Sequence, residues 1–291
     1  MSSSDADDPD QLYQLANRRL FAPGGARDIA GAHAILREAE SKGHVEAACM
    51  RAHLIANGTG CHANPDEAER LLKKIAPRDA YARAKIEMMK RYSGTAEPSR
   101  EVVSAAPEIV LVGGLLAPEE CRYIMTLAEP RLEPSVVQDP ATGRRVPHPV
   151  RTSYGASFGP TQEDLVINRI NRRVASATGT RYEWGEPLLV LRYAPGQQYR
   201  PHVDTLPGAA NQRFWTALIY LNDGYDGGGT DFPDLGITIG GAMGDALLFR
   251  NLTGDGRPDP RTRHAGLPVT SGEKWLATRW IRQAPYHPWS E

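Results

Sequence analysis

The sequence has few cysteines, no long apolar run and no excess of charge of either sign. Three cysteines among 291 residues, an odd number at scattered positions, argue against a disulfide framework and favour a reducing compartment. No apolar stretch approaches the roughly 20 residues of a membrane-spanning helix. The polar, acidic start is unlike a secretory signal. We therefore predict a cytoplasmic location.

The charge is nearly balanced, with 34 Lys and Arg residues against 35 Asp and Glu residues. Such a balance creates no field that would attract nucleic acid or an anionic membrane, so neither is expected as a partner. Hydrophobic residues make up 41% of the chain, which is enough for a packed core, and the length suits two domains. The sequence leaves the oligomeric state open.

Residues 1–95 are predicted to form a domain of helical repeats. Residues 28–36 and 64–72 align at an offset of 36, and the same offset pairs Ala16 with Ala52. A period of this length, with small residues at packing positions and Gly-rich turns, indicates stacked helical hairpins. The pattern resembles Sel1-like repeats, which are related to the tetratricopeptide class.

The beginnings of two repeat helices are marked by capping residues. Asp28 and Asn64 are predicted N-caps, and Pro65 stands at the first helical position. Repeats of this kind either dock a partner or only support a neighbouring domain, and the sequence does not distinguish the two roles. Residues 96–107, rich in Ser, Pro, Ala and charge, are predicted to be a linker.

From residue 108 the pattern changes to short β-rich runs bounded by Gly and Pro. A helix is expected to begin at Pro118. The predicted strands are residues 108–112, 188–193, 215–221, 237–239, 246–249 and 275–282. Many short strands with Gly-rich turns indicate a sandwich or jelly roll. The fold class is therefore α+β, multidomain, with a helical repeat domain before a β domain.

Four residues of this β region form a pattern with chemical meaning. His202 and Asp204 are two positions apart, so on a strand they point to the same side. With a second imidazole from His264 they could occupy one face of Fe(II) and leave other positions open. A structural zinc site would favour four protein ligands. Lys274 follows His264 by ten positions and offers a compact positive charge for a carboxylate.

These residues belong to a series of blocks that covers more than half of the chain, from about residue 110 to residue 283. The blocks are RTSYG (151–155), EPLLVLRYAPGQQY (186–199), RPHVD (200–204), ALIYLN (217–222), GGGTDF (227–232), GDALLF (244–249), HAGLPV (264–269) and KWLATRW (274–280). In their order they resemble the prolyl 4-hydroxylase-type 2-oxoglutarate- and Fe(II)-dependent dioxygenases. The resemblance implies a double-stranded β-helix, a cupin-like jelly roll, over residues 108–291.

The resemblance also implies the cofactors and the residues that hold them. Fe(II) would be bound by His202, Asp204 and His264, with O₂ as co-substrate and ascorbate as a reductant. Lys274 would pair with the far carboxylate of 2-oxoglutarate, and Tyr193 and Thr230 would be hydroxyl donors beside it. Halogenating relatives replace the metal-binding carboxylate with a small residue, so the aspartate favours hydroxylation, with release of succinate and CO₂.

The substrate side rests on the same resemblance. The residues expected to line a peptide groove are Arg151, Ser153, Glu186, Tyr199, Arg213 and Trp280. Arg282 departs from several peptide-hydroxylating relatives, which carry a histidine there. The favoured substrate is a prolyl residue in a peptide or protein. The N-terminal repeats could help to dock that substrate.

Two other functions stay open at this point. One is hydroxylation of a free amino acid, another small molecule or a non-prolyl side chain, which a small closed pocket would favour. The other is a repeat-based binding or sensor protein with a vestigial oxygenase domain. The complete set of metal-binding residues and Lys274 speak against the second.

Overall fold

The chain divides into two compact units, a helical one and one built on β-sheets. The computed structural model describes residues 8–22, 27–91, 98–138, 145–147 and 150–289. The helical unit comprises residues 1–94, 158–169 and 288–291, and the sheet unit comprises residues 95–157 and 170–287.

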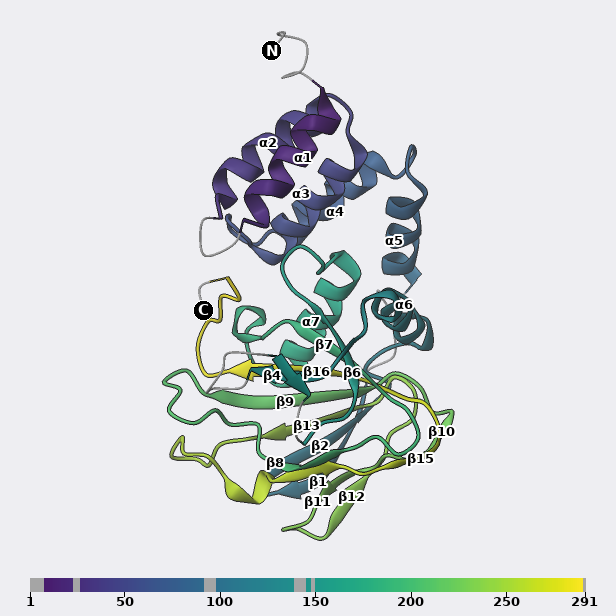
Figure 1. Cartoon of the computed structure of the whole chain (residues 1–291), viewed down its shortest axis with the longest axis vertical. Coiled ribbons are helices and arrows are strands. Elements are labelled where there is room, and N and C mark those ends of the chain that lie inside the picture. Colours follow the sequence, from purple (N-terminus) through teal and green to yellow (C-terminus); the bar gives the residue numbers. More distant parts are fainter. Residues whose placement is uncertain (1–7, 23–26, 92–97, 139–144, 148–149, 290–291) are drawn as a thin grey trace. The chain divides into compact units, whose positions relative to one another are not determined.

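Five helices make up most of the helical unit. They are α1 (Pro9–Leu20), α2 (Ile29–Ser41), α3 (Val45–Asn57), α4 (Pro65–Ile75) and α5 (Ala80–Arg91). Each helix packs against the next one along the chain, as Figure 1 shows. The predicted helical character of this region is confirmed.

Positions separated by 36 residues occupy equivalent places in this unit. Ala32 and Ala68 are fully buried on α2 and α4, and so are Leu36 and Leu72 one turn further along. Small residues at the first pair allow close helix packing, and the leucines fill the core beside them. The repeat is therefore structural, while its assignment to the Sel1-like class stays a prediction.

The predicted caps are confirmed at both repeat helices. The side chain of Asp28 accepts a hydrogen bond from the backbone N–H of Gly31 at 2.8 Å. The side chain of Asn64 accepts one from Glu67 at 3.1 Å. Each bond satisfies an N–H group that the first turn of a helix otherwise leaves without a partner.

Two segments distant in sequence complete the helical unit. Asp164 forms a buried ion pair with Lys85 of α5. The same carboxylate accepts hydrogen bonds from the N–H groups of Val166 and Ile167, at the start of α7 (Leu165–Ala177). Near the other end of the chain, Trp289 packs against the core of the first helices. The helical unit thus draws on sequence from three parts of the chain.

The sheet unit contains the strands and the remaining helices. The helices are α6 (Pro118–Ala128), the second part of α7, and the 3-10 turns Glu129–Arg131, Tyr182–Trp184 and Pro260–Thr262. The strands of the larger sheet are β1 (Ser99–Ala105), β2 (Glu108–Gly113), β3 (Glu133–Pro134), β6 (Tyr154–Phe158), β7 (Leu188–Tyr193), β9 (Arg213–Tyr220), β13 (Ala246–Arg250) and β16 (Lys274–Arg282). The others are β4 (Val136–Gln138), β5 (Arg145–Pro147), β8 (Tyr199–His202), β10 (Tyr225–Gly227), β11 (Thr230–Phe232), β12 (Ile237–Ile239), β14 (His264–Gly266) and β15 (Val269–Gly272).

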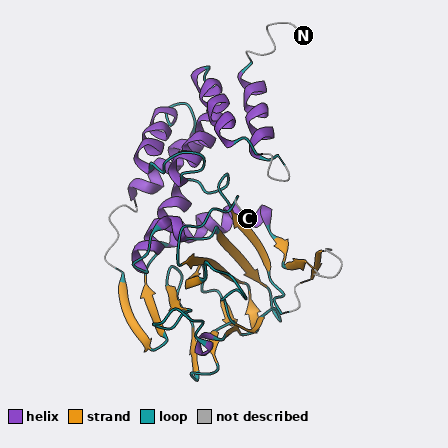
Figure 2. Ribbon diagram, turned by 90° about the vertical axis from the view of Figure 1, so that its left-hand side faces the viewer, coloured by secondary structure: helices purple, strands orange, loops and turns teal. Residues whose placement is uncertain are grey.

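Two antiparallel sheets enclose the core of this unit (Figure 2). The larger has the strand order β1-β2-β13-β9-β16-β7-β6-β3, and the smaller has the order β12-β11-β14-β8. Leu218 and Phe249 of the larger sheet share one apolar cluster with Phe232 and Ile239 of the smaller sheet. Side chains alternate between the two faces of each sheet, so every second residue of a strand points into the space between the sheets and can line a pocket there.

The prediction of a linker over residues 96–107 is wrong for Ser99–Ala105, which form β1. This strand pairs antiparallel with β2, with Val102 opposite Val110. Val103 packs against the core, whereas the rest of the strand is largely exposed at the edge of the sheet. An edge strand needs few apolar residues, so its polar composition resembled that of a linker.

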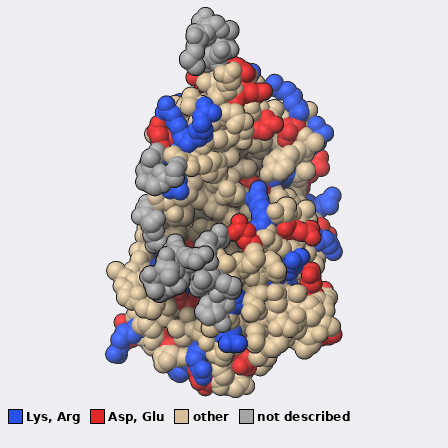
Figure 3. Space-filling model, in the orientation of Figure 1, with Lys and Arg blue, Asp and Glu red and all other residues tan. Residues whose placement is uncertain are grey.

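Acidic and basic side chains are interspersed over the face shown in Figure 3. This distribution agrees with the formal net charge of -1. In the part of the chain that the structure describes, no helix combines the length and the apolar character needed to cross a bilayer.

Candidate metal centre

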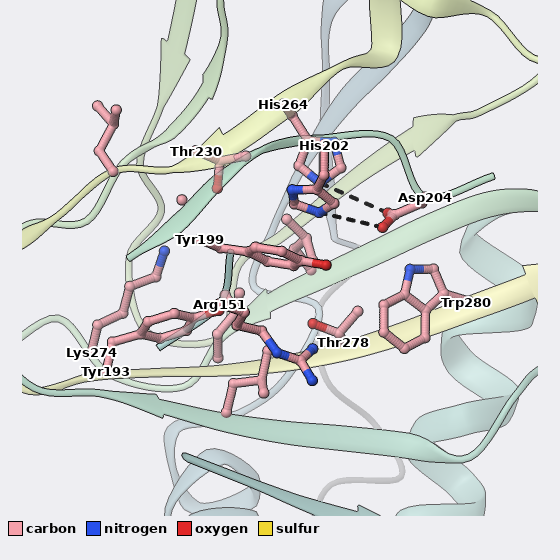
Figure 4. A pocket seen from close by; sticks show the side chains of 15 residues that line it. Arg151, Tyr193, Tyr199, His202, Asp204, Thr230, His264, Lys274, Thr278 and Trp280 are labelled. Carbon is pink, nitrogen blue, oxygen red and sulfur yellow. Dashed lines mark ion pairs between the residues drawn. The ribbon is translucent and has the colours of Figure 1, made fainter. Parts of the chain in front are cut away.

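A pocket in the sheet unit brings together nine of the twelve predicted site residues (Figure 4). These nine are Arg151, Tyr193, Tyr199, His202, Asp204, Thr230, His264, Lys274 and Trp280. They come from both sheets, and in Figure 4 Lys274 lies at one end of the pocket and the two histidines and Asp204 at the other. The pocket therefore has a cationic end and a metal-binding end.

The register of the smaller sheet positions the two histidines. His264 on β14 is the cross-strand partner of His202 on β8, and Asp204 lies two positions past the end of β8. One nitrogen of each histidine and one carboxylate oxygen all lie within 4.8 Å of one another. Asp204 and His264 are buried, and His202 is half-buried. This geometry suits a single metal ion held by three side chains.

Backbone carbonyl groups fix the protonation of both imidazoles. Nδ1 of His202 lies 2.9 Å from the carbonyl oxygen of Arg200, and Nδ1 of His264 lies 2.9 Å from that of Thr262. A carbonyl oxygen only accepts, so Nδ1 carries the proton in each ring. Each Nε2 then presents a lone pair toward the centre of the cluster, which is the arrangement of a metal-binding histidine.

The nitrogen and oxygen atoms of the three side chains face one another at distances longer than a hydrogen bond. Nε2 of His202 lies 3.6 Å from Oδ1 of Asp204, and Nε2 of His264 lies 3.8 Å from Oδ2. Burial lowers the pKa of His264, which favours the neutral ring. The Thr216 hydroxyl donates to Oδ2 of Asp204 at 2.6 Å, which favours the ionised carboxylate. Two imidazoles and one ionised carboxylate are a donor set that fits Fe(II).

Lys274 supplies the positive charge at the other end of the pocket. Its side chain is 3% exposed, and its Nζ donates to the carbonyl oxygen of Gly228 at 2.6 Å. Among the described residues it has no carboxylate partner, and burial lowers the pKa of its ammonium group to about 8. Because a buried charge is costly without a counterion, the site favours an anionic ligand.

The groups around Lys274 include both predicted hydroxyl donors. Tyr193 is the cross-strand partner of Lys274, and burial raises the pKa of its hydroxyl to about 12, so the hydroxyl stays protonated. Thr230 is buried on β11, with its hydroxyl 3.4 Å from that of Tyr220. The rings of Tyr193 and Tyr220 have their centres 6.0 Å and 5.5 Å from Nζ of Lys274. The cation therefore lies among aromatic rings and hydroxyl groups.

Two of the predicted substrate residues lie against the metal-binding end. Tyr199 stacks on His202, with ring centres 3.5 Å apart and planes inclined by 17°. The guanidinium group of Arg151 lies over the ring of Tyr199, 5.4 Å from its centre. Trp280 also lines the pocket, on the side of Asp204 in Figure 4. These positions are compatible with contact to a substrate.

Ser153, Glu186 and Arg213 do not line this pocket. Ser153 is buried, with its hydroxyl 3.0 Å from that of Ser135. Glu186 accepts hydrogen bonds from Arg213 at 2.7 Å and 2.8 Å and also pairs with Arg282. The Arg213 guanidinium in turn stacks over Trp280, 3.7 Å from the ring centre. Glu186 and Arg213 thus engage each other, Ser153 engages Ser135, and the contact of all three with substrate stays a prediction.

One polar residue of the pocket was not predicted. Thr278 on β16 is buried and lines the pocket together with Lys274, Leu276 and Trp280. The four residues alternate along the strand, so period-two reasoning from Lys274 would have identified this position.

Comparison with known proteins agrees with the site. Residues 188–282 match the model of the 2OG-Fe(II) oxygenase superfamily. The chain is 42% identical over 202 residues to Prolyl 4-hydroxylase 1 of Arabidopsis thaliana, covering 63% of this chain and 71% of that protein. It is 36% identical over 210 residues to Probable prolyl 4-hydroxylase 10 of the same plant, covering 64% and 72%.

A solved structure is similar as well. The viral collagen prolyl hydroxylase from Paramecium Bursaria Chlorella virus-1, in complex with 2OG, is 27% identical with a TM-score of 0.48, covering 60% of this chain and 96% of that one. The sequence relatives establish the assignment, because the match extends over most of their length at substantial identity. The protein belongs to the prolyl 4-hydroxylase family of 2-oxoglutarate- and Fe(II)-dependent oxygenases, whose cofactors are Fe(II), 2-oxoglutarate and O₂.

Proposed function

We propose that this 2-oxoglutarate-dependent dioxygenase hydroxylates prolyl residues in a peptide or protein. The observation that carries the proposal is the two-ended pocket, with a complete metal-binding set at one end and a buried lysine without a carboxylate partner in the described chain at the other. The prolyl substrate is supported by relatives named prolyl 4-hydroxylases.

His202, Asp204 and His264 would hold Fe(II) through Nε2 of each ring and a carboxylate oxygen. When bound, the iron with 2-oxoglutarate supplies the oxidation of an unactivated C–H bond, coupled to release of succinate and CO₂. Lys274 would bind the far carboxylate of 2-oxoglutarate, and ascorbate would be the reductant. The hydroxyl groups of Tyr193 and Thr230 would donate to the same carboxylate.

The protein's own contribution is to bind, orient and exclude water. Lys274 provides an ammonium group that gains a counterion only when the dicarboxylate enters, so its charge selects an acid of the right length. Leu191, Leu218 and Leu276 also line the pocket and contribute apolar surface to it. An apolar, closed surrounding strengthens the attraction between the ammonium group and the carboxylate.

A second cleft favours an extended substrate over a small molecule. It is lined by Arg131 of the 3-10 turn Glu129–Arg131, by Pro134 of β3 and by Ser157 of β6 among others, and it shares Arg151 with the metal-binding pocket. Arg151 would then contact a chain that passes from one cleft to the other. A free amino acid would need only the first pocket.

The domain assignment is part of the proposal. Residues 108–291 would form a double-stranded β-helix, supported by two facing antiparallel sheets with the pocket residues on both. Residues 1–95 would be Sel1-like repeats that dock the substrate protein, supported by the 36-residue repeat of buried positions. A cytoplasmic location completes the proposal.

Turnover with matched substrates tests the function. The purified protein would be incubated with Fe(II), 2-oxoglutarate, ascorbate and proline-containing peptides, with the same peptides carrying alanine for proline, and with free proline. We expect succinate and the gain of one oxygen atom only in the proline peptides, and neither product with His202→Ala. Oxidation of free proline alone would favour the small-molecule function. Absence of succinate under all conditions would contradict a catalytic role.

A further inference from the structure

A chain of buried hydrogen bonds leads to the carboxylate of Asp204. The side-chain amide of Asn251, which follows β13, donates to Oγ1 of Thr216 on β9 at 2.9 Å. The hydroxyl of Thr216 donates to Oδ2 of Asp204 at 2.6 Å. Asn251 and Thr216 are completely buried, and Asp204 is 3% exposed. Neither Thr216 nor Asn251 lines the pocket.

The chemistry of the three groups fixes the direction of these hydrogen bonds, from Asn251 through Thr216 to Asp204. An amide N–H only donates, so Thr216 must accept from Asn251 with a lone pair. The single proton of the hydroxyl is then available for Asp204, and the carboxylate accepts it at Oδ2. Hydrogen bonds arranged in sequence polarise one another, which strengthens the last one. The carboxylate is therefore restrained in rotation, and one lone pair of Oδ2 accepts the hydrogen bond from Thr216.

We propose that Thr216 and Asn251 are positioning residues that hold Asp204 as a metal ligand in one orientation. The inference rests on the proposed function, because it assigns the metal to His202, Asp204 and His264. Groups that orient a metal-binding carboxylate contribute to metal affinity without touching the metal.

The amide of Asn251 is not explained by stability alone. Its Oδ1 is buried without a hydrogen-bond partner in the described part of the chain. A buried acceptor without a partner costs stability, and an apolar side chain of similar size would avoid that cost. A purely structural position would favour leucine here, whereas a positioning role requires the N–H donor.

Metal affinity of the apo-protein tests the inference without any turnover. Mn(II) would be titrated into wild type, Thr216→Val, Thr216→Ser and Asn251→Leu, and free Mn(II) would be followed by electron paramagnetic resonance. Thermal unfolding would be measured for each. Thr178→Val is the matched control, because it removes another buried threonine hydroxyl, at the end of α7, away from the pocket.

We expect Thr216→Val to weaken Mn(II) binding on the order of 10–100-fold. Thr216→Ser and Thr178→Val should bind as the wild type does. Asn251→Leu should show a smaller loss of affinity with unchanged or higher thermal stability, a combination that a structural role would not produce.

Equal affinity of wild type and folded Thr216→Val would overturn the inference, and so would a loss in Thr216→Ser as large as in Thr216→Val. If Thr216→Val does not fold, Asn251→Leu decides, since wild-type affinity in that variant removes the role of the amide. A wild type that binds no Mn(II) would instead contradict the proposed function.

Discussion

Two buried lysines, one in each unit, have opposite surroundings. Lys85 in the helical unit is 2% exposed and forms an ion pair with Asp164. Lys274 in the sheet unit is 3% exposed and contacts the carbonyl oxygen of Gly228. Burial lowers the pKa of both ammonium groups, but for Lys85 the carboxylate of Asp164 opposes this effect.

The difference separates a structural charge from a ligand-binding charge. A protein that buries an ammonium group beside its own carboxylate completes the pair during folding, and nothing more is required. Lys274 has no such carboxylate in the described chain and lies in the same pocket as the three metal-binding residues. We therefore propose that a ligand supplies its counterion. Burial alone does not distinguish the two lysines, whereas a carboxylate beside Lys85, and none beside Lys274 in the described residues, does.

The largest effect on stability is expected from Lys85→Met. The substitution leaves the buried Asp164 carboxylate without the ammonium group of Lys85, which should cost about 3–5 kcal/mol of unfolding free energy. Urea denaturation of the variant and the wild type would measure it. Asp164→Asn in the same chain should recover part of the loss, because asparagine still caps α7 without a charge. An unchanged unfolding free energy in Lys85→Met would show that the ion pair with Asp164 does not stabilise the helical unit.

Lys274→Met should lower the affinity for 2-oxoglutarate without lowering the unfolding free energy, the reverse of what is expected for Lys85→Met. Loss of the ammonium group should weaken 2-oxoglutarate binding by about 2–5 kcal/mol, since the far carboxylate loses its partner. The unfolding free energy should stay the same or rise, because an uncompensated buried charge has been removed. Calorimetric titration of the Mn(II)-loaded protein with 2-oxoglutarate gives the affinity. Wild-type affinity in this variant would show that the lysine is not the anion-binding group.

The pH dependence of the same binding step gives an intermediate effect. The pKa of Lys274 is about 8 in the ligand-free protein, below its ordinary value of 10.5, and a carboxylate ligand favours the protonated form. Affinity for 2-oxoglutarate should fall by about tenfold per pH unit above this pKa. The pKa values of Tyr193 and Tyr225 are raised to about 12 by burial, so these rings stay protonated in that range.

Stability of the ligand-free protein should change in the opposite direction over the same range. Between pH 8 and pH 10.5 the unfolded chain binds more protons at this lysine than the folded chain, so its contribution to stability rises with pH. Titrations at several pH values, paired with urea denaturation, measure both trends. Affinity that is constant from pH 7 to pH 9 would contradict the assigned charge.

The smallest effect is expected at a helix cap. Asn64→Ala removes the acceptor for the N–H of Glu67 and should cost about 1 kcal/mol. Asn64→Asp keeps an acceptor and is the control. Thermal unfolding would show the difference, while the affinity for 2-oxoglutarate should be the same in both variants. A change in ligand affinity would mean that the helical unit contributes to the pocket.

The sequence predicts local features of this protein better than its distant contacts. The bounds of β7 and β12 match the predicted strands, and the caps at Asp28 and Asn64 are confirmed, because each depends on a few neighbouring residues. The prediction failed at β1, where an exposed edge strand has the composition of a linker.

Distant contacts depend on which strands become neighbours, and periodicity does not fix that. Alternation indicates which side chains share a face, yet the pairing of Glu186 with Arg213 and Arg282 requires the strand order and register of the folded sheet. The hydrogen bond between Thr216 and Asp204 likewise joins β9 of the larger sheet to the loop that follows β8 of the smaller sheet. Without that arrangement, the sequence does not show that Glu186 and Arg213 pair with each other.

We propose that the pocket binds Fe(II) at one end and 2-oxoglutarate across both ends. Anaerobic titration of the apo-protein with Fe(II) and 2-oxoglutarate, followed by visible absorption, tests it most directly, because chelation of the iron by the acid produces a charge-transfer band. We predict a saturable band in the wild type and in folded Lys85→Met, a band that requires much more 2-oxoglutarate in Lys274→Met, and none in His202→Ala. Absence of the band in the wild type, or its persistence in His202→Ala, would show that this pocket does not bind the iron and the acid as proposed.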